Sequence, residues 1–252
     1  SDMIHNNFSI TKIIISNGKL NIKFNEENKP NYLIGKTNSN TESKVKIEEI
    51  VLLNSEVLVK NLSTQFNMSI ETERAIIELS QSNIKLQTSA FSKYLTIGKV
   101  GYLDNKNINI KANLIVKKDT IKILKSELAI EEISANAKGI IINNNNIDLK
   151  IKLENQIISE LIPNFPENIQ NFCNPFIING NITSDILLNG KISKESNPLF
   201  EMDYTITDGL YELKSMPFRL KNISMMGSVT NGEQHNFKST KIIASEFISE
   251  TK

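Results

Sequence analysis

Apolar and polar residues alternate along most of the chain, as they do in β-strands that have one apolar and one polar face. In "GKLNIKF" (18–24) the alternate positions are Leu20, Ile22 and Phe24. The same period of two runs through "INIKANLIV" (108–116), "NIDLKIKL" (146–153) and "LFEMDYTI" (199–206). These runs are rich in Ile, Leu and Phe, with Val and Thr, and β-branched and aromatic residues suit a pleated surface. The pattern therefore predicts a mainly β fold.

Short polar segments separate the alternating runs, and several contain Asn, Asp or Gly, which tolerate positive φ. We expect them to be hairpin turns: Asn17-Gly18, Asp104-Asn105, Lys118-Asp119, 143–146 and Asp208-Gly209. Parallel strands would need long crossovers, which the pattern does not indicate. The prediction is a long antiparallel meander. Between Leu220 and Ile223 the alternation slips by one residue, which predicts a β-bulge at Asn222.

One segment, "NQIISELIPNFPENIQNFCNP" (155–175), has helical spacing instead. Pro163 would end a first helix, and Pro166 can open a second at its first position. We predict helices at 155–162 and 166–172. This helical insert (155–175) divides the chain into an N-terminal meander (4–154) and a C-terminal meander of the same sheet (176–252), after a cloning remnant at 1–3.

Composition excludes several classes of function. The 252 residues include 29 Lys and Arg against 28 Asp and Glu, a net charge of +1 without a basic block, which argues against nucleic-acid binding. No run reaches the roughly 18 apolar residues that a membrane helix needs, and no signal peptide opens the chain. Cys173 is the single cysteine, so it cannot form an internal disulfide.

Residues that could carry chemistry are few and scattered. His5 and His235 lie in polar surroundings far apart in the sequence, and Cys173 follows Phe172 in the helical segment, where a buried, inert thiol is expected. No glycine-rich loop precedes a helix to hold phosphate, and the Asn run at 143–146 lacks the spaced carboxylates of a calcium loop. We therefore expect no catalytic residues, metal site or cofactor, and no enzymatic activity.

From about residue 155 onward, the order of sequence features resembles the AsmA family of Gram-negative envelope proteins, in the form of its C-terminal region found in Bacteroidetes. "ISELIPNFPENIQNF" is similar to the family's Leu- and Pro-containing helix, and "FIINGNITSDILLNGKI" to its strand with paired glycines, here Gly180 and Gly190. "NPLFEMDYTITDGLYEL" and "FRLKNISMMGSVTNG" are similar to the strands that follow. Near the start, "FSITKIIISNGKLNIKF" resembles the family's recurring strand pair.

The resemblance implies an antiparallel sheet curled into a groove with a hydrophobic interior. It also implies a periplasmic protein, anchored in the inner membrane by a segment outside these residues, of which this chain is a fragment. Members of the family are thought to conduct phospholipids towards the outer membrane and so to support outer-membrane biogenesis. The expected partner is a phospholipid or another lipid with acyl chains, with the oligomeric state left open.

The residues expected to face the groove belong to the alternating runs. They are Leu20, Ile22, Phe24, Ile108, Ile110, Leu114, Leu149, Ile151, Ile182, Ile186, Phe200, Met202 and Tyr204. The alternative is a structural or adhesive β-sandwich of the cell envelope, in which the same residues form a closed core between two sheets. A porin-like barrel is disfavoured because aromatic girdles are missing.

Overall fold

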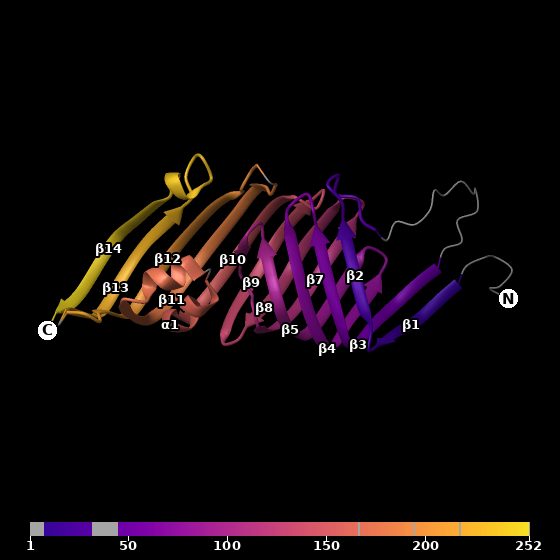
Figure 1. Cartoon of the computed structure of the whole chain (residues 1–252), viewed down its shortest axis with the longest axis horizontal. Coiled ribbons are helices and arrows are strands. Elements are labelled where there is room, and N and C mark those ends of the chain that lie inside the picture. Colours follow the sequence, from indigo (N-terminus) through magenta and orange to yellow (C-terminus); the bar gives the residue numbers. More distant parts are fainter. Residues whose placement is uncertain (1–7, 32–44, 166, 194, 217, 252) are drawn as a thin grey trace.

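The computed structural model describes residues 8–31, 45–165, 167–193, 195–216 and 218–251, and within them the strands form one 14-stranded sheet (Figure 1). Strands make up 73% of the described residues and helices 7%, which confirms the predicted mainly β fold. The sheet order is β1-β3-β4-β5-β7-β8-β9-β10-β11-β12-β13-β14, with β2 beside β3 and β6 beside β5. A division into two facing sheets, as in the sandwich alternative, is not found, because every described strand belongs to this one sheet.

The strands are long, and many exceed ten residues. They are β1 (Phe8–Ser16), β2 (Lys19–Phe24), β3 (Val45–Asn61), β4 (Phe66–Ser80), β5 (Asn83–Ile97), β6 (Val100–Gly101), β7 (Lys106–Lys117), β8 (Thr120–Ile130), β9 (Ile133–Ile142), β10 (Asn146–Ile157), β11 (Phe176–Lys191), β12 (Leu199–Leu213), β13 (Phe218–Thr230) and β14 (Lys241–Thr251).

From β3 onward the sheet is an antiparallel meander, as predicted. The hairpin at Lys118-Asp119 is confirmed by the pairing of Lys117 with Thr120, and the turn at 143–145 by the pairing of Ile142 with Asn146. Lys118 has a φ of 45° and Asn143 one of 52°, the left-handed conformation that short hairpin turns require. Asn105 (φ 56°) lies directly before β7.

The predicted hairpin at Asn17-Gly18 is wrong, and the sheet is mixed rather than purely antiparallel. β1 and β2 both pair in parallel with β3, one after the other along the same edge. Asn17 donates its backbone N–H to Leu53 O (2.9 Å), and the carbonyl of Gly18 accepts from Glu56 N (2.9 Å), so the chain kinks and continues instead of reversing. The Ser55 hydroxyl accepts the N–H of Gly18 (3.2 Å) and holds this kink.

The predicted turn at Asp208-Gly209 is also wrong. β12 continues through both residues to Leu213, and the reversal to β13 comes after it. The pairing with β13 shifts register on each side of Gly209, so the two residues form a β-bulge, with Asp208 at a φ of 52°.

The bulge predicted at Asn222 is confirmed by a register shift between Lys221 and Ser224 and by a φ of 50° at Asn222.

Irregular positions occur on four neighbouring strands, at Asn155 (β10), Gly180 (β11), Asp208-Gly209 (β12) and Asn222 (β13), and the last three lie side by side. A side chain at Gly180 (φ 127°) would lie 2.8 Å from the Cα of Gly209, so two backbones approach here at a distance that excludes a Cβ atom. Bulges bend a strand and increase its local twist. The irregularities on β11, β12 and β13 therefore bend the sheet at this place.

The helical segment is shorter than predicted and is divided into three parts. α1 (Ile158–Leu161) is followed by a 3₁₀ turn, η2 (Ile162–Asn164), and by α2 (Glu167–Cys173). Residues 155–157 belong to β10, where the side-chain oxygen of Gln156 accepts the N–H of Ser134 on β9 (2.7 Å). Pro163 lies in the first turn of η2, and the helical segment contacts β10 and β11. A further 3₁₀ turn, η3 (Phe237–Ser239), precedes β14.

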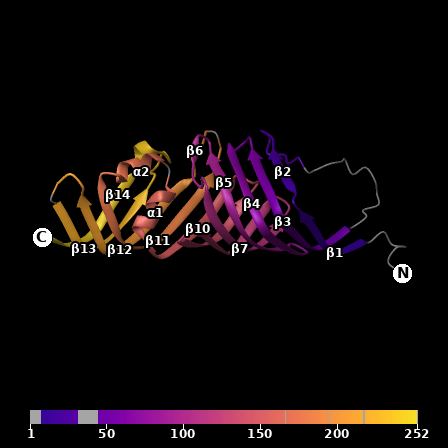
Figure 2. The ribbon, with the colours of Figure 1, turned by 60° about the horizontal axis from the view of Figure 1, so that its bottom comes forward.

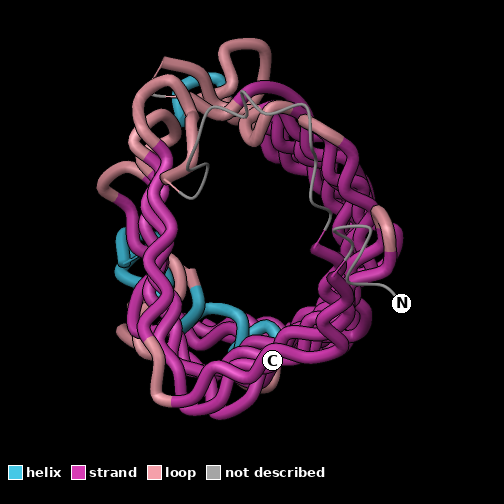
Figure 3. Tube along the Cα trace, turned by 90° about the vertical axis from the view of Figure 1, so that its right-hand side faces the viewer, coloured by secondary structure: helices cyan, strands magenta, loops and turns pink. Residues whose placement is uncertain are grey.

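Viewed in two orientations, the sheet is an elongated, strongly curved ribbon (Figures 1 and 2). Viewed down the long axis of the molecule, the Cα trace follows a ring (Figure 3). One contact joins parts of the ribbon that are far apart in the sequence. The side chain of Asn28, after β2, donates to Asn143 O in the turn between β9 and β10 (2.6 Å) and accepts from the amide of Asn61 (2.9 Å).

Gly180→Ala should destabilise the protein more than an alanine at a glycine that has only a positive φ. Gly98 (φ 63°) is such a control, because a Cβ there would meet only the end of the Gln65 side chain, at 3.5 Å. We expect Gly98→Ala to lower the free energy of unfolding by about 1 kcal/mol. Gly180→Ala should lower it by roughly 1–3 kcal/mol more, because of the overlap with Gly209. Urea unfolding measures both, and equal losses would contradict the close approach of β11 to β12.

Candidate functional site: the apolar face of the sheet

The strand register places the alternating apolar residues on one continuous face. Residues that pair directly across neighbouring strands share a face. One such row crosses from β4 to β12 through Leu79, Ile84, Leu114, Ile123, Gly139, Leu149, Leu188 and Phe200. A second row joins Ile151 to Ala137 and to Ile186, and Ile186 to Met202. We call this side of the sheet the apolar face and the opposite side the polar face.

All the residues predicted from the sequence to face a groove lie on the apolar face. Leu20, Ile22 and Phe24 reach it through their pairings with β3, and the others belong to the rows that cross β7 to β12. All except Leu20, which is 42% exposed, are buried or half-buried. Residues between them in the sequence, such as Lys111 and Lys150, are exposed on the polar face.

The prediction missed other residues of the apolar face, because bulges interrupt the alternation. On β8, Ile121 and Ile123 occupy odd positions but Leu128 and Ile130 even ones, and the register shifts between Ile123 and Ser126. All four nevertheless lie on the apolar face. A search that allowed one slip in the period would have found them.

No second layer of strands packs on the apolar face within the described residues. Each strand packs extensively only against its neighbours in the sheet, and α1 and α2 contact only β10, β11 and η2 to any extent. Even so, Ile108 is 3% exposed and Ile147 7%. Such burial is expected on the inner face of a curved sheet, where side chains of neighbouring strands crowd together, and Figure 3 shows that the Cα trace follows a ring.

Tyr204 is the largest residue that is buried on this face, with 8% exposure. Its ring lies against Gly227 of β13, where a Cβ would be 2.6 Å from the Tyr204 oxygen. Its hydroxyl donates to Ile243 O on β14 (3.3 Å), so one side chain links three strands. Beside it, the buried hydroxyl of Ser184 has no hydrogen-bond partner among the described residues.

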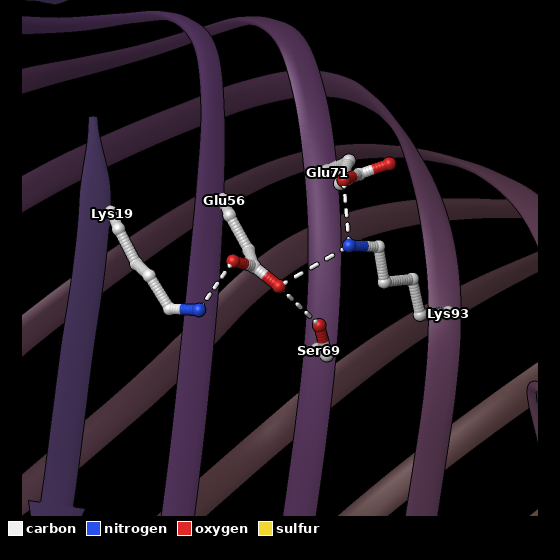
Figure 4. A network of polar contacts seen from close by, with 5 residues as sticks. All are labelled: Lys19, Glu56, Ser69, Glu71 and Lys93. Atoms are coloured by element: carbon white, nitrogen blue, oxygen red, sulfur yellow. Dashed lines mark hydrogen bonds and ion pairs between the residues drawn. The ribbon is translucent and has the colours of Figure 1, made fainter. Parts of the chain in front are cut away.

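The polar face carries a network of charged side chains from β2 to β5 (Figure 4). Glu56 bridges Lys19 (2.8 Å) and Lys93 (3.3 Å) and accepts from the Ser69 hydroxyl (3.2 Å), while Lys93 also contacts Glu71 (2.7 Å). The hydrogen bond from Lys19 is the main reason that the pKa of Glu56 lies below its ordinary value, and the bond to Glu71 chiefly raises the pKa of Lys93. The network holds four strands in register from the solvent side.

Two depressions on the protein surface lie over the polar face. One of about 770 Å³ adjoins the network and is lined by Glu56, Glu71 and Phe91, among other residues. Another, of about 650 Å³, lies over β8 to β12.

The structure does not bring the candidate chemical groups together. The Nδ1 atom of His235 lies 3.1 Å from Asn197 O in an exposed loop, and Cys173 is a half-buried free thiol at the end of α2. His5 lies outside the described residues. Across the described ranges no group of three or more His, Cys, Asp and Glu side chains is arranged to hold a metal ion.

Helices in the described part of the chain are too short, or too polar, to cross a bilayer. Comparisons of the chain with protein-family models, with curated proteins and with solved structures found no match.

Glu56→Gln should lower the thermal unfolding midpoint at neutral pH, because it removes the carboxylate that Lys19 and Lys93 share. The pKa of Glu56 is lower in the folded state than in the unfolded state, so its contribution is complete above the unfolded pKa and is lost as the pH falls through the folded pKa. The difference between wild type and variant should therefore disappear in acid. Glu132→Gln is the control, since no ion pair or hydrogen bond engages Glu132 in the described ranges. A constant difference across the pH range would contradict this role.

Proposed function

We propose that the chain is a non-enzymatic lipid-binding module that carries phospholipid along its apolar face. The observation that supports this proposal is a face of Ile, Leu, Met and Phe side chains that is continuous across the sheet and that no second layer covers within the described residues. Monomeric soluble proteins seldom leave an apolar surface of this extent without a partner.

The chemistry of the face suits a mobile apolar guest. Burial of hydrocarbon against Ile and Leu side chains is favourable by about 25 cal/mol per Å² and has no directional requirement. A surface of this kind binds acyl chains by contact area and leaves them free to move along it. Most charged groups, which would fix a headgroup in one place, lie on the polar face.

The resemblance to the AsmA family extends this proposal to a cellular role. In that role the full protein is anchored in the inner membrane, extends into the periplasm and conducts phospholipids towards the outer membrane. The same strands that resemble the family, β11 to β13, contribute Ile186, Met202 and Tyr204 to the apolar face.

A photo-crosslinking amino acid placed on the two faces of one strand tests the proposal. At Ile110 or Met202, on the apolar face, it should capture phospholipid in cells, which mass spectrometry of the cross-linked protein identifies. At Lys111, the neighbour of Ile110 on the polar face, capture should be at least tenfold lower. Equal labelling of both positions, or capture of protein alone from the apolar face, would favour a structural or adhesive role.

Replacement of His235 or Cys173 by Ala should leave lipid capture at Ile110 unchanged. Neither side chain lies on the apolar face or has partners suited to catalysis. His5→Ala should likewise leave lipid capture at Ile110 unchanged. Loss of capture in a variant that still folds, as judged by circular dichroism, would show that the protein depends on chemistry at that residue.

A further inference from the structure

The depression of about 650 Å³ on the polar face has an unusual arrangement of charges. Its lining includes Lys138 (β9), Lys150 (β10), Asp185 (β11) and Asp203 (β12). All four side chains are exposed on the side of the sheet opposite to the apolar face. The lysines of the lining lie on β8 to β10 and these two carboxylates on β11 and β12. Glu154 on β10 and Glu201 on β12 also belong to the lining.

Like charges face each other on neighbouring strands twice in this depression. Lys138 pairs directly with Lys150, and Asp185 pairs directly with Asp203. Directly opposite residues have Cβ atoms about 4.5–5.5 Å apart, and like charges at that distance destabilise a sheet. Each of these two like-charged pairs is therefore locally unfavourable in the sheet.

Among the described residues, these two pairs also lack ion-pair contacts of their own. Nearby lysines do have partners, since Lys125 contacts Glu127 (2.8 Å) and Lys152 contacts Glu154 (2.7 Å). In the described part of the chain, no ion pair or hydrogen bond engages the side chains of Lys138, Lys150, Asp185 or Asp203. Asp185 lies opposite Lys152 and attracts it only at longer range, because the Lys152 ammonium is held by Glu154.

The two pairs are close enough to hold one small ligand. β10 and β11 are neighbours, about 4.8 Å apart. Lys150 pairs with Leu187, and Asp185 is two residues further along the same strand, a diagonal neighbour within reach of a long side chain. Leu187 and the 47% exposed Leu124 add apolar contact area to the same depression.

We propose that this depression binds a zwitterionic phosphoethanolamine group. The ammonium groups of Lys138 and Lys150 donate hydrogen bonds to the phosphate oxygens, and the ligand ammonium donates to the carboxylates of Asp185 and Asp203. Charge-assisted hydrogen bonds of this kind are stronger than neutral ones. The link between the two charged ends of the ligand lies over Leu187. The site is independent of the apolar face and does not rest on the proposed lipid transport.

Calorimetric titration of the purified chain with O-phosphoethanolamine tests the site. We expect saturable binding, and at least tenfold weaker binding of inorganic phosphate or of ethanolamine, each of which engages only one pair. The double variants Lys138→Gln with Lys150→Gln, and Asp185→Asn with Asp203→Asn, should each weaken binding at least tenfold. The lysine double variant should also raise the unfolding midpoint or leave it unchanged, because like charges are removed.

The matched control is a second pair of directly opposite lysines, Lys23 and Lys60, which lies outside this depression. Lys23→Gln with Lys60→Gln should leave the affinity unchanged. Absence of binding at millimolar O-phosphoethanolamine, full affinity in either depression variant, or an equal loss in the control variant would overturn the proposal.

Flotation with phosphatidylethanolamine vesicles then identifies the source of the ligand. Binding to vesicles that depends on Lys138 and Lys150 indicates a lipid headgroup, and binding of the soluble compound alone indicates a free phosphoethanolamine metabolite.

Discussion

Main-chain hydrogen bonds between neighbouring strands hold this molecule together, because no second layer of strands packs against the sheet within the described residues. In a sandwich, two sheets share a core and each stabilises the other. Here a strand is stabilised by the strands on either side and by the side chains that they place on the same face. Each strand must therefore present its apolar residues in register with both neighbours, and a shift by one residue would move every side chain to the wrong face.

The β-bulges allow long, curved strands to keep their apolar residues in register with both neighbouring strands. β8 changes the parity of its apolar positions between Ile123 and Ser126, and the pairing with β7 and β9 shifts at the same place, so the apolar face continues without a break. At Gly180 and Gly209 the absence of side chains lets β11 and β12 approach closely where both strands bend. The polar face then collects the charged residues, and pairs such as Lys19 and Glu56 join strands from the solvent side.

Most of the sheet could be predicted from local alternation, but its irregularities could not. The period of two predicts β10 and β12 correctly because each apolar position has a polar neighbour on the opposite face. At Asn17-Gly18 and Asp208-Gly209 the sequence pattern wrongly predicts hairpin turns, because the same left-handed conformations occur in a hairpin, a kink and a bulge. The choice among these depends on partners distant in the sequence, such as Ser55 and Ile223, which a local pattern cannot contain. The charge pairs of the polar face, such as Lys138 with Lys150, were not predicted because they exist only once the register is known.

The contact of Asn28 with Asn143 and Asn61 has a consequence for the order of folding. Hairpins between consecutive strands close short loops, so most of the sheet can grow from local contacts at low entropic cost. Asn28 and Asn143 are 115 residues apart in the sequence, and β9 and β10 must be in place before the turn between them can accept the Asn28 amide. The parallel pairing of β1 and β2 with β3 also spans a long connection. The N-terminal edge is therefore expected to dock last, and an intermediate without β1 and β2 would still contain the antiparallel meander from β3 onward.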